Sequence, residues 1–242
     1  MKRRIYFLLV STVCAITVLF TSDTKITANM SERMFSESSP QVDYDVLGKF
    51  RNTYYYSALE SEYQELAIDD EILDMQDRVL AKVSRKFRRA VDIEGTGKLI
   101  DGRVINYAGV KNKRIRYRVT ENIYGDGVGS CALVPFHTVA VDRTKIALGS
   151  VVYIDETYNM LLPDGTRHNG LWKAEDVGGA IKRDRIDLFV GEGDQGEVLE
   201  AAGIGHLEAL TVRLVSPPSQ DTCTRLPETA EPIPAQWPLQ NP

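Results

Sequence analysis

The sequence predicts a mainly β fold, a small barrel of short strands, and three observations support this prediction. From Thr138 onward, short β-prone segments follow one another at close spacing. Turn-forming residues such as Pro163-Asp164-Gly165 separate these segments. Helical periodicity is confined to one long and one short segment. Many short strands with few helices are typical of a small barrel.

The N-terminus predicts export. Lys2, Arg3 and Arg4 precede an apolar or small-residue run from Ile5 to Phe20. A basic start and an apolar run shorter than the roughly 20 residues of a membrane span are typical of a secretory signal. We therefore expect residues 1–28 to be a signal peptide and the protein to reach the periplasm, the cell envelope or the medium. The alternative is an uncleaved anchor, which would attach the exported protein to the membrane.

The two flanks of the predicted domain are polar or rich in proline. Residues 29–47 contain many Ser, Glu and Asp residues and are expected to form a linker. Seven of the ten prolines fall in residues 217–242, and proline lacks the N–H that would extend a sheet. We expect this stretch to be a mobile tail. The folded domain is therefore predicted at residues 48–216.

Secondary structure in the first half of the domain follows from local patterns. Phe50–Tyr56 is aromatic and is predicted to be the first strand. Asp69–Val91 has apolar residues at helical spacing, acidic residues at its start and basic residues at its end, so it predicts a helix. Asp101-Gly102 predicts a hairpin turn. Arg114–Val119 predicts a strand whose arginines, Arg114, Arg116 and Arg118, form either a solvated basic face or a docking surface for acidic peptides.

In the second half, the strands expected are Thr138–Val141, Ser150–Ile154, Leu171–Ala174, Arg185–Val190 and Ala209–Val215. A short helix over Gln195–Ala202 should begin after Asp194 and end at Gly203.

Charge, histidines and cysteines limit the possible partners and cofactors. The formal net charge of -5 argues against nucleic acid, which needs a basic surface, and is compatible with a neutral glycan. His137, His168 and His206 lack the spacing of metal ligands, so we expect neither a metal nor a cofactor. If Cys14 is removed with the signal, Cys131 and Cys223 remain. In an exported protein this pair favours a disulfide over two free thiols.

Two acidic residues lie in adjacent predicted strands. Strand alternation points Ile186, Leu188 and Val190 into the core and puts Asp187 and Phe189 on the opposite face. The same alternation groups Trp172, Ala174 and Asp176 on one face of the preceding strand. Gly178-Gly179 follows and leaves backbone open to a ligand. The pattern predicts two carboxylates and two aromatic rings near one groove.

Two acids in a groove are typical of glycoside cleavage, in which a carboxyl group protonates the leaving oxygen. The alternative is that Asp176 and Asp187 only cap turns at strand ends, and spacing alone favours that alternative.

A longer composite motif resembles a known family. Asp142 precedes Ile146-Ala147-Leu148-Gly149, Asp176 opens Asp-Val-Gly-Gly-Ala-Ile-Lys, and Asp187 follows eleven residues after Asp176. This pattern is similar to the signature of the 3D domain family, named for three aspartates, which includes the catalytic barrel of membrane-bound lytic transglycosylase A. Thr53–Tyr56 resembles the aromatic first strand of that family. The chain departs from the pattern at Ala147, where proline is usual, which affects turn rigidity and not chemistry.

The resemblance implies a six-stranded double-psi β-barrel within residues 48–216, with an α/β insertion at residues 57–130 after the first strand. It implies a monomer that cleaves peptidoglycan glycan strands, with Asp187 as the catalytic acid and base. Asp176 would raise the pKa of Asp187 or hold it, and Asp142 would either support the site or have a purely structural role. The substrate-binding residues expected are Tyr55, Tyr56, Trp172, Gly178, Gly179 and Phe189. Two other functions stay open: a hydrolytic muramidase, and a barrel that binds glycan without cleaving it.

Overall fold

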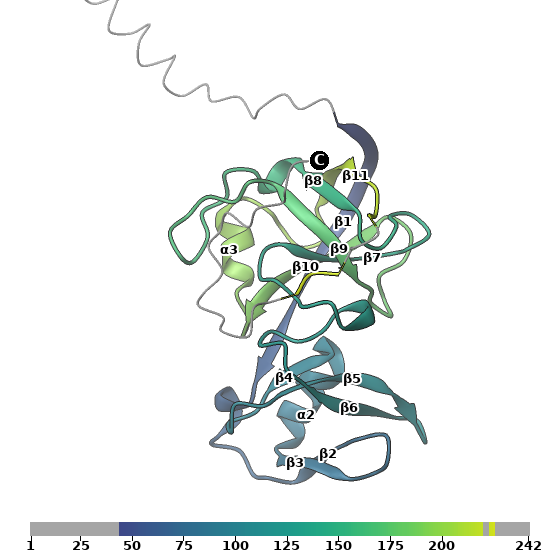
Figure 1. Ribbon diagram of the computed structural model, residues 1–242. Coiled ribbons are helices and arrows are strands. Elements are labelled where there is room, and N and C mark those ends of the chain that lie inside the picture. The colour runs from purple at the N-terminus through teal and green to yellow at the C-terminus, as the bar shows by residue number, and fades with distance from the viewer. Residues whose placement is uncertain (1–43, 220–222, 226–242) are drawn as a thin grey trace, which may run out of the picture. The chain divides into compact units, whose positions relative to one another are not determined.

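A computed structural model describes residues 44–219 and 223–225 of the protein. This part is mainly β with few helices (Figure 1). The expected signal peptide, most of the expected linker and most of the proline-rich tail lie outside the described residues. Within the described residues, no helix is both long enough and apolar enough to cross a membrane.

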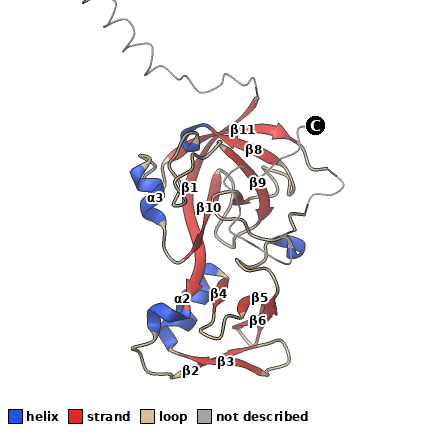
Figure 2. Ribbon diagram, turned by 60° about the vertical axis from the view of Figure 1, so that its left-hand side comes forward, coloured by secondary structure: helices blue, strands red, loops and turns tan. Residues whose placement is uncertain are grey.

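In the described part of the chain, six strands pair in a closed cycle. They are β1 (Asp45–Leu59), β11 (Ala209–Ser216), β8 (Val151–Ile154), β9 (Leu171–Asp176), β7 (Thr138–Val141) and β10 (Arg185–Glu192), paired in this order, and β10 pairs back with β1. The β1–β10 and β7–β9 pairs are parallel and the others are antiparallel. Figure 2 shows these strands in red, with helix α3 (Gly196–Ala201) beside them. The double-psi arrangement of their connections stays a prediction.

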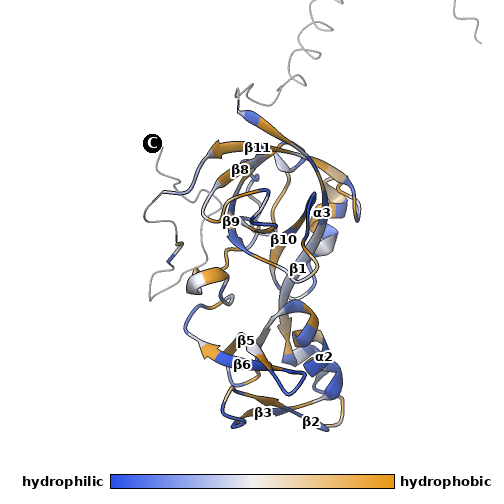
Figure 3. Ribbon diagram, turned by 90° about the vertical axis from the view of Figure 1, so that its right-hand side faces the viewer, coloured by the Kyte–Doolittle hydropathy of each residue, from blue (hydrophilic) through white to orange (hydrophobic). Residues whose placement is uncertain are grey.

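Alternation along these strands builds one apolar core. Ile186, Leu188 and Val190 are buried in it, as the sequence predicted, together with Val139 and Val141 from β7. Asp187 lies between two core residues and therefore points to the opposite face of the sheet. Apolar residues, orange in Figure 3, run along β11, which contributes Leu210 and Val212.

Strand β1 is longer than predicted and belongs to two groups of strands. Its first part pairs with β10 and β11, and its last residues, Ala58 and Leu59, pair in parallel with β4 (Thr96–Lys98). It begins at Asp45, so the expected linker ends earlier and the domain starts before residue 48. The aromatic run Thr53–Tyr56 lies in the middle of β1, where it pairs with the strand that carries Asp187.

Residues 60–130 form the insertion and have a core of their own. The elements are η1 (Glu60–Tyr63), β2 (Asp70–Leu73), β3 (Val79–Val83), α2 (Arg85–Glu94), β4, β5 (Val104–Lys111), β6 (Arg114–Thr120) and η2 (Val128–Ser130). Ile72, Phe87, Ile105 and Tyr117 are buried together between them. The expected α/β character of the insertion is present, and the hairpin turn at Asp101-Gly102 connects β4 and β5.

The predicted helix over Asp69–Val91 is wrong in its first half, where β2 and β3 form a hairpin instead. The Asp74 carboxylate accepts the N–H groups of Gln76 and Arg78 at 2.8 and 2.9 Å, which closes a turn. Asp77 has a φ of 63°, a left-handed conformation that ends any helix there. The helix begins only after Ser84, whose hydroxyl accepts the N–H of Phe87.

Each arginine of the predicted basic face of β6 meets a carboxylate, and only Arg114 and Arg118 keep exposed side chains. Arg114 pairs with Asp70 at 3.1 Å, and Arg118 pairs with Asp126. Arg116 is only 4% exposed and pairs with Asp77 at 2.9 Å. These pairs neutralise the strand.

Candidate active site

Asp187 is held by a hydroxyl on the neighbouring strand. The parallel pairing of β1 with β10 puts Thr53 directly opposite Asp187. The Thr53 hydroxyl lies 2.5 Å from Asp187 Oδ1, the distance of a strong hydrogen bond to a carboxylate. Arg185 Nη2 and Nε in turn donate to Thr53 Oγ1 at 3.2 and 3.3 Å. The carboxyl group is therefore fixed on the outer face of the closed sheet.

The environment of Asp187 favours its neutral form. Its side chain is half-buried, and burial raises the pKa to about 6, although the Thr53 hydrogen bond and the charges of Arg185 and His206 oppose this rise. A carboxyl group with such a pKa carries a proton in a useful fraction of molecules near neutral pH. Asp187 is thus suited to give and to take a proton.

Asp176 reaches the same face because of a β-bulge. Val139 of β7 pairs with Ala174, and Ala140 pairs with Asp176, so Glu175 is skipped in the register. The Tyr55 hydroxyl donates to Asp176 Oδ2 at 2.9 Å, and the Val177 N–H donates to Oδ1 at 2.8 Å. Burial, and then the negative charge of Asp187, raise the pKa of Asp176 to about 7. Two carboxyl groups with raised pKa values therefore share one surface.

The same bulge makes the prediction for Trp172 wrong. Trp172 is 1% exposed and lies in the main core, stacked on His168 at 4.9 Å between ring centroids. Its indole N–H donates to Thr157 Oγ1 at 3.0 Å. Simple alternation had grouped Trp172 with Asp176, but the extra residue in the strand reverses the face of Asp176.

Tyr55 and Phe189, which were also predicted to bind substrate, do not expose a ring face to a sugar. Phe189 is fully buried and packs against Tyr55, with ring centroids 5.1 Å apart. Tyr55 is itself buried, so its contribution is the hydroxyl group that holds Asp176. Tyr56 faces the other side of β1 and packs against the two apolar cores. Trp172 and Phe189, the two rings predicted near one groove, are therefore both buried, and substrate contact at Tyr55 and Tyr56 stays a prediction.

Asp142 is an anchor for a loop and not a proton carrier. Its carboxylate accepts the Thr144 N–H and hydroxyl and the Arg183 N–H, the last at 2.7 Å. These hydrogen bonds, with that from Arg183 first, lower the pKa of Asp142 to about 2. Because Arg183 belongs to the loop between β9 and β10, Asp142 fixes the segment that joins Asp176 to Asp187.

The two glycines of this loop have different surroundings. A Cβ atom on Gly178 would lie 2.5 Å from Ile181 Cγ1, so Gly178 is needed for packing. A Cβ atom on Gly179 would meet nothing within 4 Å, and Gly179 is exposed. Gly179 is the one of the pair whose backbone a ligand can approach.

The three aspartates fall inside a segment that a family model recognises. Residues 137–208 match the model of the 3D domain. The protein carries a 3D domain.

The similarity to a solved structure covers more of this chain than the match to the 3D domain does. The crystal structure of E. coli MltA with bound chitohexaose matches with a TM-score of 0.51 and 19% identity, over 71% of this chain and 73% of that chain. The membrane-bound lytic murein transglycosylase from Agrobacterium tumefaciens is 18% identical, with a TM-score of 0.41, over 73% and 69% of the two chains. MltA from Neisseria gonorrhoeae is 21% identical, with a TM-score of 0.39, over 62% and 50%. No curated protein matches the chain.

Residues outside the 3D domain complete the site, and sequence reasoning did not assign them a role. Thr53 of β1 has no distinguishing pattern except its place beside the tyrosine run. Glu94 ends α2, and its carboxylate accepts the Tyr56 N–H at 3.2 Å. Burial, and then the charges of Asp187 and Asp194, raise the pKa of Glu94 to about 7. No local sequence signal could have identified it, because its surroundings come from β1 and β10.

Tyr124 is a further half-buried aromatic residue, and it packs against the small buried cluster of Tyr55, Leu133, Ala140 and Phe189. It also lines a cavity of about 290 Å³, together with His137, Glu192 and others. Neither Asp176 nor Asp187 is among the described residues that line this cavity.

Proposed function

We propose that the protein is a peptidoglycan lytic transglycosylase, with Asp187 as the single acid and base. The observation that carries this proposal is the pair of raised-pKa carboxyl groups, Asp187 and Asp176, fixed on one face by Thr53 and Tyr55. The fold supports it, because the E. coli protein of similar fold was solved with a bound glycan, chitohexaose.

The proposed reaction uses one carboxyl group twice. Protonated Asp187 gives its proton to the oxygen that joins N-acetylmuramic acid to N-acetylglucosamine, and the C1–O bond breaks. The 6-hydroxyl of the same muramic sugar then forms a bond to C1, and its proton passes to the Asp187 carboxylate. The product is a 1,6-anhydro sugar, and the enzyme returns to its starting protonation state. Because the nucleophile belongs to the substrate, no second acid has to attack the sugar.

The other aspartates have supporting roles in this proposal. Asp176, when neutral, leaves Asp187 without a negative neighbour, so that Asp187 can lose and regain its proton near neutral pH. Tyr55 and the Val177 N–H keep Asp176 in this place. Asp142 fixes the loop between them through Arg183.

The setting of the enzyme follows from the same proposal. The substrate is the glycan strand of peptidoglycan, which lies outside the cytoplasm, in agreement with the signal-like N-terminus. The six paired strands would form a double-psi β-barrel, and the chain would act as a monomer without cofactor or nucleic acid. Tyr124 and Gly179 are the exposed or half-buried groups that we expect the glycan to touch.

Mass spectrometry of muropeptides tests the proposal. Purified protein is incubated with peptidoglycan sacculi, and we expect products that end in 1,6-anhydro-N-acetylmuramic acid. Products with a reducing muramic end would instead identify a hydrolytic muramidase. Retention of the protein on sacculi with no soluble product, in both the full chain and a chain that begins at residue 29, would identify a glycan-binding module and overturn the proposal.

A further inference from the structure

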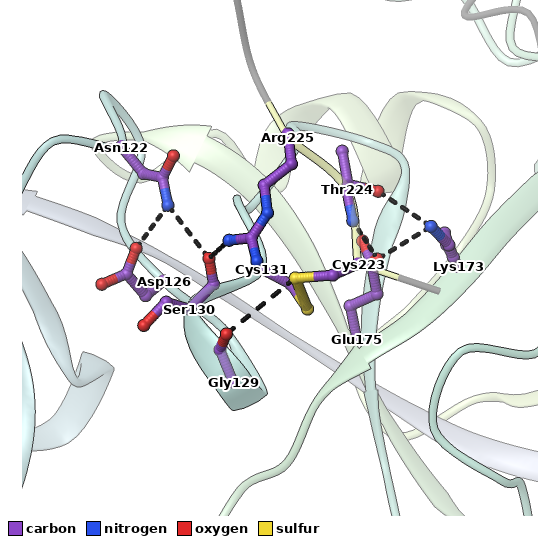
Figure 4. The surroundings of a disulfide bond; sticks show 10 residues. All are labelled: Asn122, Asp126, Gly129, Ser130, Cys131, Lys173, Glu175, Cys223, Thr224 and Arg225. Atoms are coloured by element: carbon purple, nitrogen blue, oxygen red, sulfur yellow. Dashed lines mark hydrogen bonds and ion pairs between the residues drawn. A yellow bond between two sulfur atoms is a disulfide. The ribbon is translucent and has the colours of Figure 1, made fainter. Parts of the chain in front are cut away.

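Three segments meet at Glu175, the bulge residue of β9 that precedes Asp176 in the sequence (Figure 4). They are the bulge residue Glu175, the loop of residues 126–132, and the C-terminal segment Cys223–Arg225. The sequence predicted that residues beyond 216 form a mobile tail. That prediction is wrong for Cys223–Arg225, because Thr224 is only 7% exposed and packs against the domain.

Glu175 is a buried carboxyl group whose Oε1 atom has one partner in its own strand and one in the C-terminal segment. It is 3% exposed, and its Oε1 accepts the Thr224 N–H at 2.6 Å. Lys173 Nζ lies 2.9 Å from the same oxygen and donates to Thr224 Oγ1 at 3.1 Å (Figure 4). A buried carboxylate is costly unless it is paired and hydrogen-bonded. Glu175 therefore depends on Thr224 to remain inside the protein.

The C-terminal segment is fastened at three points. Cys131 and Cys223, the pair predicted from the cysteine count, form a disulfide with a Cα–Cα distance of 4.9 Å. The Ala132 N–H donates to the Thr224 carbonyl at 2.9 Å. Arg225 Nη1 donates to the Ser130 carbonyl at 2.9 Å. The segment is thus attached to the same loop that contacts the bulge.

The loop of residues 126–132 lies very close to the backbone of the bulge. A Cβ atom on Gly127 would lie 2.4 Å from the Glu175 carbonyl oxygen, which is closer than real Cβ contacts come. Gly127 is itself fixed, because its N–H donates to the Cys131 carbonyl at 2.8 Å. Glu175 is therefore held on its backbone by the Cys131 loop and on its side chain by Thr224.

We propose that Cys223–Arg225 is a positioning element for Asp176: it keeps Glu175 inside the bulge, and the bulge directs the Asp176 carboxyl group toward Tyr55. Thr224 and Glu175 are positioning residues, because they touch the bulge and not the reacting groups. The consequence for catalysis rests on the proposed function, whereas the effect on Asp176 does not.

A matched pair of variants at Thr224 tests the proposal. Thr224→Pro removes the N–H that Glu175 accepts. Thr224→Val keeps this N–H and the side-chain shape and loses only the hydroxyl. We expect Thr224→Pro to lower kcat by on the order of 10- to 100-fold, the size of effect that a small misplacement of a reacting group causes, with KM changed by less than about twofold. Thr224→Val should keep kcat within about threefold of the unchanged protein.

Titration of the Asp176 carboxyl group decides the proposal whether or not the protein cleaves glycan. Its carboxyl carbon is followed by NMR in protein with ¹³C-labelled aspartate and is assigned by its loss in Asp176→Asn. Burial is the first cause of the raised pKa, about 7, so release of the bulge admits water and should lower that pKa in Thr224→Pro and not in Thr224→Val.

An Asp176 pKa that is the same in Thr224→Pro and in the unchanged protein overturns the proposal, whatever the activity. If Thr224→Pro does not fold, as judged by circular dichroism, the double variant Cys131→Ser with Cys223→Ser replaces it. This variant removes the disulfide that attaches the C-terminal segment and changes no charge beside Asp176, and the same fall in the Asp176 pKa is expected. Absence of anhydro products from the unchanged protein would contradict the proposed transglycosylase function. The titration result would still test whether Cys223–Arg225 positions Asp176.

Discussion

The closed sheet and the insertion both carry carboxyl groups, and the pKa values of Asp176 and Asp187 on the closed sheet shift in the opposite direction to that of Asp77 in the insertion. In the insertion, Asp77 accepts hydrogen bonds from Lys111 and Arg116, which lower its pKa. On the closed sheet, Asp187 and Asp176 are held mainly by hydroxyl groups, and burial raises their pKa values to about 6 and about 7. The comparison separates carboxylates that stabilise a fold from carboxyl groups that can exchange a proton.

Glu94 shows where the two regions meet. It belongs to the insertion, yet its pKa is raised to about 7 by burial and by the charges of Asp187 and Asp194. Its partner is the Tyr56 N–H of β1, and not a lysine or arginine. The region that supports proton exchange thus extends past the 3D domain to the end of α2.

The comparison between carboxyl groups with raised and lowered pKa values predicts its largest effect for Asp187→Asn, which should lose glycan cleavage. This change keeps the side-chain shape and removes the titrating proton, so we expect turnover to fall by about 10⁴-fold while glycan binding remains. Asp176→Asn should follow, and Asp142→Asn should be the mildest because its carboxylate is already charged. The release of anhydro-muropeptides by each folded variant is the measurement. Near-normal turnover in Asp187→Asn would contradict the assignment.

The pH dependence of kcat/KM should give the next largest effect. Asp187 must carry a proton before cleavage, and its pKa of about 6 means that it loses this proton as pH rises. We expect kcat/KM to fall about tenfold per pH unit above that pKa. Asp142→Asn serves as the control and should leave the midpoint unchanged, because the pKa of Asp142 is lowered to about 2. A rate that rises through pH 8 would show that another group supplies the proton.

Stability should change in opposite directions at the two kinds of carboxyl group. The folded pKa of Asp187, about 6, lies above its unfolded value, so ionisation costs stability increasingly as pH rises from about 4 through 6. Asp187→Asn should therefore raise the free energy of unfolding by on the order of 2 kcal/mol at pH 8 and leave it unchanged at pH 4.

Asp142→Asn is the matched control for this stability prediction. The folded pKa of Asp142, about 2, lies below its unfolded value, so its charge adds stability above the unfolded pKa and loses it as pH falls through the folded one. We expect this variant to be less stable at neutral pH. Urea denaturation at both pH values measures the two changes, and equal changes in both variants would remove the distinction between the groups.

The smallest expected effect is at Arg114 in the insertion. Its ion pair with Asp70 is largely exposed, so Arg114→Ser should cost less than about 0.5 kcal/mol. KM for peptidoglycan that carries stem peptides should also stay the same, because the strand is neutralised by its acidic partners. A several-fold rise in KM on this substrate, and not on peptide-free glycan, would restore the docking-surface hypothesis.

Local patterns predicted the strands of the closed sheet well. Thr138–Val141 has the predicted bounds, and the other four predicted strands of this half differ from the observed ones by one or two residues at an end. These strands alternate between core and surface and are bounded by turn residues, so the sequence contains the needed information. In the insertion, the apolar spacing over Asp69–Val91 also fits a hairpin. The turn at Asp74 favours the hairpin over the helix, and the spacing of apolar residues does not reveal that turn.

The direction of a site residue could be predicted where it follows from the alternation of side chains along one strand. It could not be predicted where it depends on contacts between residues far apart in the sequence. The direction of Asp187 follows from its apolar neighbours Ile186 and Leu188. The direction of Asp176 depends on a bulge at Glu175, whose side chain is held by a residue 49 positions further along the chain. Thr53 reaches Asp187 from a strand 134 positions away. Neither partner leaves a signal in the local sequence.

The pairing of β1 with β10 has a consequence for how the protein acquires activity. Thr53 can meet Asp187 only after the ribosome has synthesised nearly the whole domain and a very long loop has closed. Until that step, the Asp187 side chain is solvated and ionised like any free aspartate, because the burial that raises its pKa does not yet exist. A chain in which β1 and β10 are not yet paired therefore lacks the acid with a raised pKa. The pairing of these two strands is the event that creates it.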